Sequence, residues 1–357
     1  MAVRAPRVLV TAAVAAALTV SSGAAGPSAR VQIRTDVENS VAAQLERATP
    51  PALPRRMPYR DFLAQAIGLS ALEPRPADVR TVDSIPLRQG SLDELAIRFD
   101  RPPVTTRALF HRHHDRSRFV FVALHGHLSN AERVIGRVPD PPAGDGSSTR
   151  SIGRRYYDRG WDVLAFDLTS DAALSSRIHA DLVLWGTTAF GLWVRAICDT
   201  IDVLELRSRY ERVVVWGLSN GGRIADQISV LCDPVSLVVV DDVIADQRRI
   251  RVHNYAETMY SQYSYYYLNA FLAGFRPADP VAETRSPKVY TRTSEYLEQS
   301  GLRAALREDF AETPLTSLAR TRIVFKRSDW HAPEWQLLDA VLDARWSDVD
   351  GFALTPR

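Results

Sequence analysis

Short apolar runs alternate with amphipathic segments from residue 90 to the C-terminal end of the chain. Several runs have no polar alternation, among them RFVFVALHG, WDVLAFD and RVVVWG, so both of their faces must be buried. Buried strands separated by helices form a mostly parallel sheet that is covered on both faces. The pattern therefore predicts an α/β fold with a doubly wound sheet. The expected strands cover 94–99, 107–114, 118–126, 161–167, 212–217, 235–242, 288–294 and 321–327, and the main expected helices cover 147–160, 187–208, 220–232 and 333–346.

Composition divides the chain into three parts. Residues 1–26 combine two arginines, an uncharged apolar stretch and the small residues SSGAAG, which is typical of a cleaved signal peptide. Residues 27–89 form a leader rich in proline, arginine and alanine, with one short helix expected at 59–73. Residues 90–357 form the main domain. Within it, residues 243–286 interrupt the alternation and are rich in tyrosine, so we expect a lid-like insertion over the site.

The signal peptide predicts a secreted or periplasmic protein. Its apolar stretch is too short to span a bilayer, and no later stretch approaches about 18 apolar residues, so we expect no stable membrane anchor. In an oxidising compartment Cys198 and Cys232 could form one disulfide, and two buried thiols are the alternative. Neither cysteine has the spacing of a zinc ligand to the other.

The charges argue against a nucleic acid partner. The chain has 44 Lys+Arg against 42 Asp+Glu, and only Lys288 and Lys326 are lysines. Charges of the two signs are interspersed, without a run of five or six of one sign. We therefore expect a small-molecule substrate and no nucleic acid.

The sequence GLSNG at 217–221 lies between an expected strand and an expected helix. It matches G-x-S-x-G, the sharp turn that exposes a nucleophilic serine above a sheet. Gly217 and Gly221 fit this turn, since larger side chains two residues from the serine would clash. The main-chain N–H of Asn220 lies at the helix N-terminus, where it can stabilise an oxyanion. Ser219 is therefore the candidate nucleophile, and Asn220 is a candidate oxyanion donor.

A serine hydroxyl is a poor nucleophile without a base, and the position of His331 suits that role. His331 follows the last expected strand and precedes the last expected helix, so it lies at the same sheet edge as Ser219. His125 and His127 follow an earlier strand. We expect the ring of His125 to fix the loop and the main-chain N–H of His127 to be the second oxyanion donor.

The sequence HRHHD at 111–115 resembles a metal-binding cluster. It falls where a hairpin turn between two strands is expected, so we interpret it as a solvated turn and not as a metal site. We expect neither a metal nor a cofactor.

The carboxylate that would orient His331 has more than one candidate. Glu295, Asp241 and Asp242 all follow strands at the expected site edge and satisfy the chain order serine, acid, histidine. We favour Glu295, which follows the strand at 288–294, and Asp242 is the alternative. We expect Asp167 to brace a neighbouring loop instead.

Together, the elbow GLSNGG, the loop LHGH and the histidine before the last helix resemble the α/β-hydrolases over about residues 90–357. The long helix before the elbow strand is similar to secreted esterases and dienelactone-hydrolase-like members. The resemblance implies an α/β-hydrolase fold and serine hydrolase chemistry. That family places an aspartate in a G-x-x-D turn after the seventh strand, whereas this chain has TRTSE at 291–295 and lacks both the glycine and the aspartate.

We therefore predict hydrolysis of a small-molecule carboxylic ester through an acyl-enzyme. Ser219 is the nucleophile, His331 the general base and Glu295 the favoured acid, while His127 and Asn220 form the oxyanion hole. The fold does not choose among the reactions it supports. A peptidase or acyltransferase with this fold, and a non-catalytic binding protein with this fold, remain the alternatives.

Overall fold

The computed structural model places the described residues in one compact unit of the chain, Ala52–Arg357. The described residues are 58–72, 76–126, 129–139, 149–168, 178, 181–242, 283–292, 321–326, 332–345 and 351–352. The predicted signal peptide at 1–26 lies outside them, as does the tyrosine-rich insertion up to residue 282.

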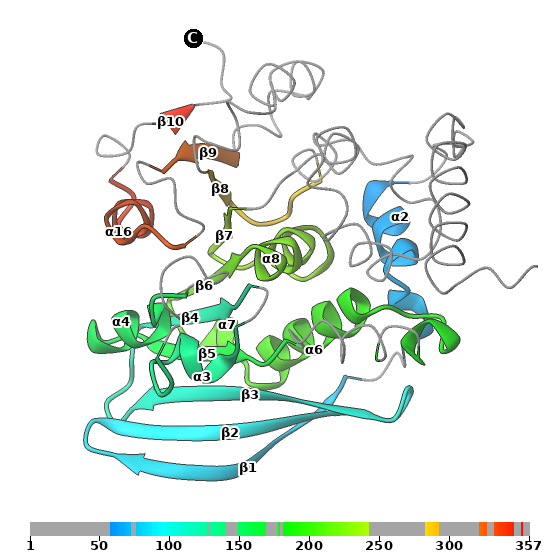
Figure 1. Cartoon of the computed structure of the whole chain (residues 1–357), viewed down its shortest axis with the longest axis horizontal. Coiled ribbons are helices and arrows are strands. Elements are labelled where there is room, and N and C mark those ends of the chain that lie inside the picture. Colours follow the sequence, from blue (N-terminus) through cyan, green and yellow to red (C-terminus); the bar gives the residue numbers. More distant parts are fainter. Residues whose placement is uncertain are drawn as a thin grey trace, which may run out of the picture. The chain divides into compact units, whose positions relative to one another are not determined.

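A ten-stranded sheet forms the centre of this unit (Figure 1), with the strand order β1-β2-β3-β5-β4-β6-β7-β8-β9-β10. Strands β5, β4, β6, β7, β8 and β9 are parallel neighbours, while β1, β2 and β3 form an antiparallel meander at one end and β10 pairs antiparallel with β9 at the other. The strands are β1 Asp78–Leu87, β2 Gly90–Phe99, β3 Val104–His113, β4 Phe119–Leu124, β5 Asp162–Phe166, β6 Arg212–Leu218, β7 Leu237–Asp241, β8 Lys288–Arg292, β9 Thr321–Phe325 and β10 Gly351–Phe352. The predicted strands and the mostly parallel sheet are thus confirmed.

Helices cover both faces of the sheet, as the sequence predicts (Figure 1). Their bounds are α2 Tyr59–Ala66, the short 3₁₀ helix η2 Leu69–Ala71, α3 Ala131–Val134, α4 Ile152–Asp158, α6 Ala189–Val203, α7 Leu206–Arg209, α8 Asn220–Leu231 and α16 Trp335–Leu342. The expected helix at 187–208 is divided into α6 and α7, because Glu205 between them has a positive φ of 54°. Among the described residues, no helix is long and apolar enough to cross a membrane.

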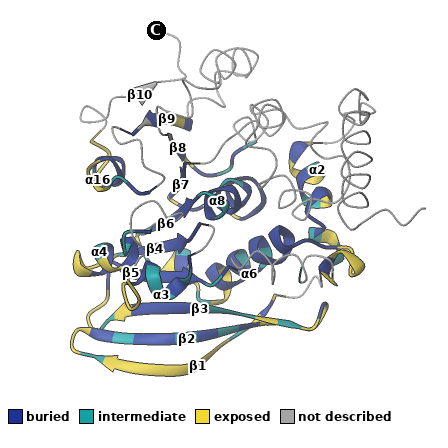
Figure 2. Ribbon diagram, viewed as in Figure 1, coloured by how far each residue is buried: buried dark blue, intermediate teal, exposed yellow. Residues whose placement is uncertain are grey.

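Two apolar cores lie on opposite faces of the sheet. Successive side chains of a strand point to opposite faces, so Val213 and Val215 of β6 contribute to one core and Val214 and Trp216 to the other. The first core contains side chains of α2, α6 and α8, and the second contains side chains of α3, α4 and α16. Figure 2 shows the buried central strands between these helices. This double burial is the reason that the central strands have continuous apolar sequences.

The fold begins before residue 90, where we predicted the start of the main domain. Strand β1 pairs along its whole length with β2, and α2 packs into the first core through Leu63. The carbonyl oxygen of Ile67 accepts hydrogen bonds from the N–H and the hydroxyl of Thr188, at 3.2 and 2.9 Å, just before α6. Part of the predicted leader is therefore integrated into the sheet and its helical layer.

The histidines at 111–113 belong to strand β3, so their interpretation as a solvated turn is wrong. His111 is buried, with only 5% of its surface exposed, and its ring stacks on that of Tyr157 with the centroids 3.3 Å apart. The ring of His113 also stacks on that of Tyr157, with the centroids 4.0 Å apart, and its Nδ1 lies 3.1 Å from Oδ1 of Asp162. The period-two alternation of a strand explains why His111 and His113 point to one face while Arg112 is exposed.

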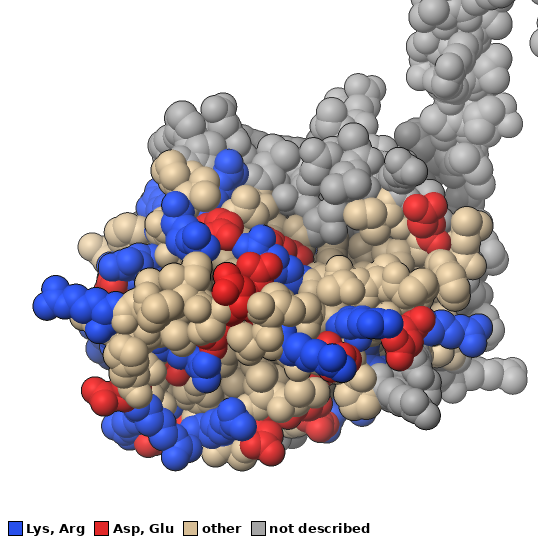
Figure 3. Space-filling model, turned by 90° about the horizontal axis from the view of Figure 1, so that it is seen from below, with Lys and Arg blue, Asp and Glu red and all other residues tan. Residues whose placement is uncertain are grey.

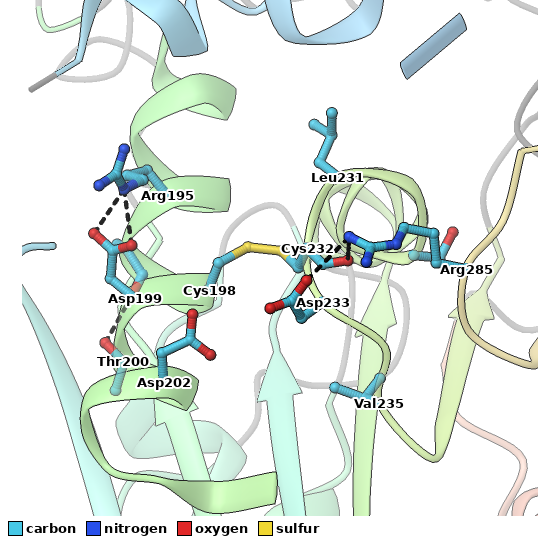
Figure 4. The surroundings of a disulfide bond; sticks show 12 residues. Arg195, Cys198, Asp199, Thr200, Asp202, Leu231, Cys232, Asp233, Val235 and Arg285 are labelled. Atoms are coloured by element: carbon cyan, nitrogen blue, oxygen red, sulfur yellow. Dashed lines mark hydrogen bonds and ion pairs between the residues drawn. A yellow bond between two sulfur atoms is a disulfide. The ribbon is translucent and has the colours of Figure 1, made fainter. Parts of the chain in front are cut away.

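A disulfide joins Cys198 of α6 to Cys232 at the C-terminal end of α8, with 5.8 Å between their Cα atoms (Figure 4). Of the two states left open by the sequence, the structure therefore shows the oxidised one. Figure 4 also shows an ion pair on each side of this link: Arg195 with Asp199, and Arg285 with Asp233. The disulfide ties α8, the helix that follows Ser219, to the neighbouring helix of the same layer.

Basic and acidic side chains are interspersed on the face of the molecule that Figure 3 shows. Exposed ion pairs occur along the chain, such as Arg80–Asp78 at 2.7 Å and Arg118–Glu211 at 2.6 Å. The hydrogen bond to Arg118 is the main cause that lowers the pKa of Glu211. Exposed pairs of this kind contribute little to stability, since water screens them.

Candidate active site

Ser219 occupies a sharp turn between strand β6 and helix α8. Its φ and ψ are 56° and −116°, in a region that non-glycine residues rarely adopt. Two main-chain hydrogen bonds fix this conformation. The N–H of Ser219 donates to the carbonyl oxygen of Asp241 at 2.9 Å, and the carbonyl oxygen of Ser219 accepts from the N–H of Arg223 at 3.0 Å.

The two glycines of the turn leave no space for a side chain. A Cβ atom on Gly217 would lie 2.1 Å from the carbonyl oxygen of Gly221. A Cβ atom on Gly221 would lie 2.2 Å from the carbonyl oxygen of Leu124 and 2.5 Å from that of His125. Because these neighbours are all main-chain atoms, they cannot rotate away. The start of α8 therefore packs directly on the end of β4, as the G-x-S-x-G pattern predicts.

The hydroxyl of Ser219 lies at the positive end of a 12-residue helix. Ser219 is half-buried, and its side chain does not cap α8. Asn220 is the first residue of α8, so its N–H belongs to the group of main-chain donors that a helix leaves at its N-terminus. The partial positive charge of the helix end favours a developing oxyanion near Ser219.

The ring of His125 is structural, as predicted. It is buried at the end of β4, where Nδ1 donates to the carbonyl oxygen of Gly126 at 2.8 Å and Nε2 accepts from the N–H of Leu168 at 2.9 Å. These bonds join the loop after β4 to the loop after β5. His127, the predicted oxyanion donor in the first loop, lies outside the described residues.

Asp167 contacts the start of helix α3, whereas we expected it to brace a neighbouring loop. Its Oδ1 accepts from the N–H of Ala131, the first residue of α3, at 2.8 Å. Its Oδ2 lies 3.5 Å from Nη1 of Arg107 on β3. Asp167 therefore joins the start of α3 to strand β3.

Asp241 is the last residue of strand β7 and Asp242 follows it, beside the strand that leads to Ser219. Both are buried. The carboxylate of Asp241 accepts from Nε1 of Trp216 at 3.0 Å and from the hydroxyl of Thr291, and its Oδ1 lies 2.6 Å from Nζ of Lys326. Asp242 has a positive φ of 55°, and its N–H donates to the carbonyl oxygen of Thr291 at 2.9 Å.

Lys326 connects these aspartates to the segment that carries His331. Its Nζ lies 3.6 Å from Oδ2 of Asp242 and donates to the carbonyl oxygen of Ala332 at 2.8 Å. Ala332 follows His331 directly in the chain. Lys326 was not predicted to be a site residue, although it is one of two lysines in the chain and follows a strand that ends at the site edge. His331 and Glu295 lie outside the described residues.

The described residues contain no group of three or more His, Cys, Asp or Glu side chains arranged to hold a metal ion.

Comparison with known proteins gives matches among solved structures only. No family model matches the chain, and no curated protein sequence matches it. Acetyl xylan esterase 1 from Thermoanaerobacterium sp. JW/SL YS485 is 12% identical with a TM-score of 0.55, and the match covers 83% of this chain and 95% of that chain. A glucuronoyl esterase from Solibacter usitatus is 11% identical with a TM-score of 0.53, over 82% and 93% of the two chains. Acetyl xylan esterase from Paenibacillus sp. R4 is 15% identical with a TM-score of 0.51, over 84% and 97%.

The chain has the α/β-hydrolase fold. This confirms the fold that the sequence resemblance implies. In this fold the parallel strands β6, β7, β8 and β9 lie side by side in chain order (Figure 1). The residues that follow these strands are therefore brought to one edge of the sheet. Ser219, Asp242 and Lys326 are the described residues that directly follow β6, β7 and β9.

Proposed function

We propose that the protein is a serine hydrolase that cleaves a carboxylic ester through an acyl-enzyme. One observation carries the proposal: Ser219 stands in a strained strand-to-helix turn whose two glycines cannot be replaced without a clash. A turn of this kind is costly, because a positive φ in a serine costs about 1–2 kcal/mol. Its effect is to hold the hydroxyl at the end of the sheet beside a helix N-terminus, which is where a nucleophile is needed.

The proposed reaction has two halves. His331 removes the proton of the Ser219 hydroxyl while Oγ attacks the ester carbonyl, and the main-chain N–H groups of Asn220 and His127 bind the oxyanion. The intermediate collapses, and the alcohol leaves with the proton that His331 held. Water then attacks the acyl-enzyme with His331 again as the base, which releases the acid and restores the serine.

For the carboxylate that orients His331 we propose Asp242, the alternative to Glu295 in the sequence. Asp242 and the carbonyl oxygen of Ala332 both contact the ammonium group of Lys326, and Ala332 follows His331 in the chain. The carboxylate of Asp241 already accepts two hydrogen bonds and forms an ion pair with Lys326, so we assign it a structural role in the site. Two carboxylates and one ammonium also leave an excess negative charge, and this would stabilise an imidazolium.

The proposed substrate class rests on the proposed ester hydrolysis and on the solved structures that match this chain. The matched structures are named as acetyl xylan and glucuronoyl esterases, so we propose that acetyl and other simple esters of sugars are the first substrates to try. We also propose export to a secreted or periplasmic location, with 1–26 as the signal peptide. The disulfide between Cys198 and Cys232 supports export, because such bonds persist in oxidising compartments.

The deciding experiment uses a fluorophosphonate probe on the whole chain, with p-nitrophenyl acetate as the assay substrate. We expect one covalent label, on Ser219 by peptide mass spectrometry, and a loss of hydrolysis in step with labelling. Ser219→Ala should abolish both. Ser208→Ala is the matched control, because Ser208 is exposed on α7 and its hydroxyl bonds only locally to the carbonyl oxygen of Glu205. Hydrolysis that persists at more than a few per cent in Ser219→Ala would exclude the proposal, since loss of a nucleophile costs several orders of magnitude in rate.

A further inference from the structure

The ammonium group of Lys326 is buried among three partners from different parts of the chain. The residue is 3% exposed, and its Nζ lies 2.6 Å from Oδ1 of Asp241, 3.6 Å from Oδ2 of Asp242 and 2.8 Å from the carbonyl oxygen of Ala332. Asp241 ends β7 and Asp242 follows it, while Lys326 follows β9 and Ala332 lies between β9 and α16. One side chain thus bridges two strands that are separated by β8.

The same network reaches the turn at Ser219. The carbonyl oxygen of Asp241 accepts from the N–H of Ser219 at 2.9 Å, and its carboxylate accepts from Trp216 of β6 and Thr291 of β8. Asp241 therefore contacts the elbow through its main chain and Lys326 through its side chain. Lys326 in turn contacts the residue that follows His331. Ser219 is one hydrogen bond away from this buried pair, and Ala332, which accepts from Lys326, is the residue after His331 in the chain.

Burial of these charges costs desolvation free energy, which their contacts have to offset. A buried ion pair is often no more stabilising than well-packed apolar side chains of the same size. The chain nevertheless keeps a lysine here, with a charge-assisted hydrogen bond to one particular carbonyl oxygen. This directed hydrogen bond fixes the position of the Ala332 carbonyl relative to the two aspartates, which an apolar contact could not do.

The other lysine of the chain gives an internal comparison. Lys288 is also buried, at the first residue of β8, where its Nζ lies 2.7 Å from Oδ1 of Asp226 and 3.0 Å from the hydroxyl of Ser229. Its partners lie in the body of α8, and it starts a parallel strand, so it stands at the sheet edge opposite to Ser219. Lys288 is therefore buried and paired with an aspartate, as Lys326 is, but its partners do not belong to the site.

We propose that Lys326 is a positioning residue, which holds Ala332, the residue after His331, beside Asp241 and Asp242 in the geometry that ester hydrolysis needs. The inference rests on the proposed function and extends it, because it assigns to Lys326 a role in kcat through Ala332 and the aspartates. Lys326 does not contact the substrate. A displacement of about 1 Å in a catalytic group can cost about 100-fold in rate, so the effect of its removal should be large.

The test compares Lys326→Met with Lys288→Met on p-nitrophenyl acetate, with kcat expressed per site that the fluorophosphonate labels and stability measured by urea unfolding. We expect Lys326→Met to lower kcat by about 30-fold or more while KM stays within about twofold. Lys288→Met should lower stability and leave kcat per labelled site within about twofold. Equal kcat values per site in the two variants would overturn the inference.

A third variant, Lys326→Arg, keeps the charge and a donor, so we expect it to fold and to recover part of the kcat that Lys326→Met loses. If Lys326→Met does not fold, Lys326→Arg decides the matter: its displaced guanidinium should lower kcat per site by more than fivefold, and a kcat equal to the parent's would overturn the inference. Failure of the proposed function gives a different result, since the parent protein itself would then show neither labelling nor hydrolysis.

Discussion

The main-chain N–H of Ser219 donates a hydrogen bond to the carbonyl oxygen of Asp241, with 2.9 Å between the two atoms. This bond joins the turn after β6 to the last residue of β7, so the conformation of the candidate nucleophile depends on the neighbouring strand. The side chain of Asp241 is fixed in turn by Trp216, Thr291 and Lys326. The strain at Ser219 is therefore supported by a buried polar network as well as by the start of α8.

Replacement of Gly221 by alanine tests how tightly this turn is packed. The new Cβ would lie 2.2 Å from the carbonyl oxygen of Leu124, so α8 would have to move away from β4. We expect a loss of about 1–3 kcal/mol in the free energy of unfolding and a fall in kcat of about 100-fold, measured by urea unfolding and p-nitrophenyl acetate hydrolysis.

Gly160→Ala is the control for that variant. Gly160 also has a positive φ, 85°, but a Cβ there would meet no atom within 4 Å. The substitution should cost about 1–2 kcal/mol of backbone strain and leave kcat unchanged. If Gly221→Ala behaves in the same way as Gly160→Ala, the close contact between α8 and β4 does not matter for activity.

The central strands could be predicted from the sequence because both of their faces are buried. Every residue of β5 and β7 is buried, which leaves a continuous apolar signal. Strand β1 has no such signal, since its sequence DVRTVDSIPL is almost wholly exposed and its place depends on pairing with β2 (Figure 2). The strand β10 is two residues long and gave no pattern at all.

The site could be predicted in part, for a related reason. The turn at Ser219 has a local signal, because its glycines and its serine are adjacent in the chain. The structural role of His125 could be inferred from its position after a strand. The role of Lys326 could not be predicted. Its partners are Asp241 and Asp242 at the end of β7, two strands earlier in the chain, and a main-chain carbonyl oxygen, which leaves no mark in the sequence. The interpretation of 111–115 as a turn was wrong because it gave the polar and charged residues more weight than the strand expected at 107–114, to which His111 belongs.

The acid of the proposed triad is tested by paired substitutions. Asp242→Asn removes a charge beside Lys326, and we expect kcat to fall by about 10³- to 10⁴-fold with little change in KM, because the imidazolium of His331 loses its partner. Glu295→Gln is the matched substitution in the segment after β8, and its effect should stay within about threefold. The measurement is steady-state hydrolysis of p-nitrophenyl acetate. The reverse pattern would assign the acid to Glu295, as we first expected from the sequence.

The last prediction concerns stability and pH, and it rests on His111. Both ring nitrogens of His111 are buried without a hydrogen-bond partner among the described residues, and the ring stacks on Tyr157. Burial is the largest cause that lowers the pKa of His111 to about 4, and the positive charges of Arg154 and His113 lower it further. The unfolded chain therefore binds a proton near pH 6.5, whereas the folded chain does so only near pH 4. Since the unfolded state takes up more protons in this window, the contribution of His111 to stability is full above pH 6.5 and is lost as the pH falls towards 4.

The corresponding loss between pH 8 and pH 5 is about 2 kcal/mol. Urea unfolding at these two pH values should show it in the parent protein, and His111→Phe should reduce the difference by that amount because phenylalanine keeps the stacking on Tyr157 and cannot be protonated. His114→Gln is the control, since His114 is exposed at the end of the same strand and its removal should leave the pH dependence as it was. A His111→Phe variant that retains the full loss at pH 5 would show that other groups cause it, and the buried ring of His111 would then have no part in the acid sensitivity of the fold.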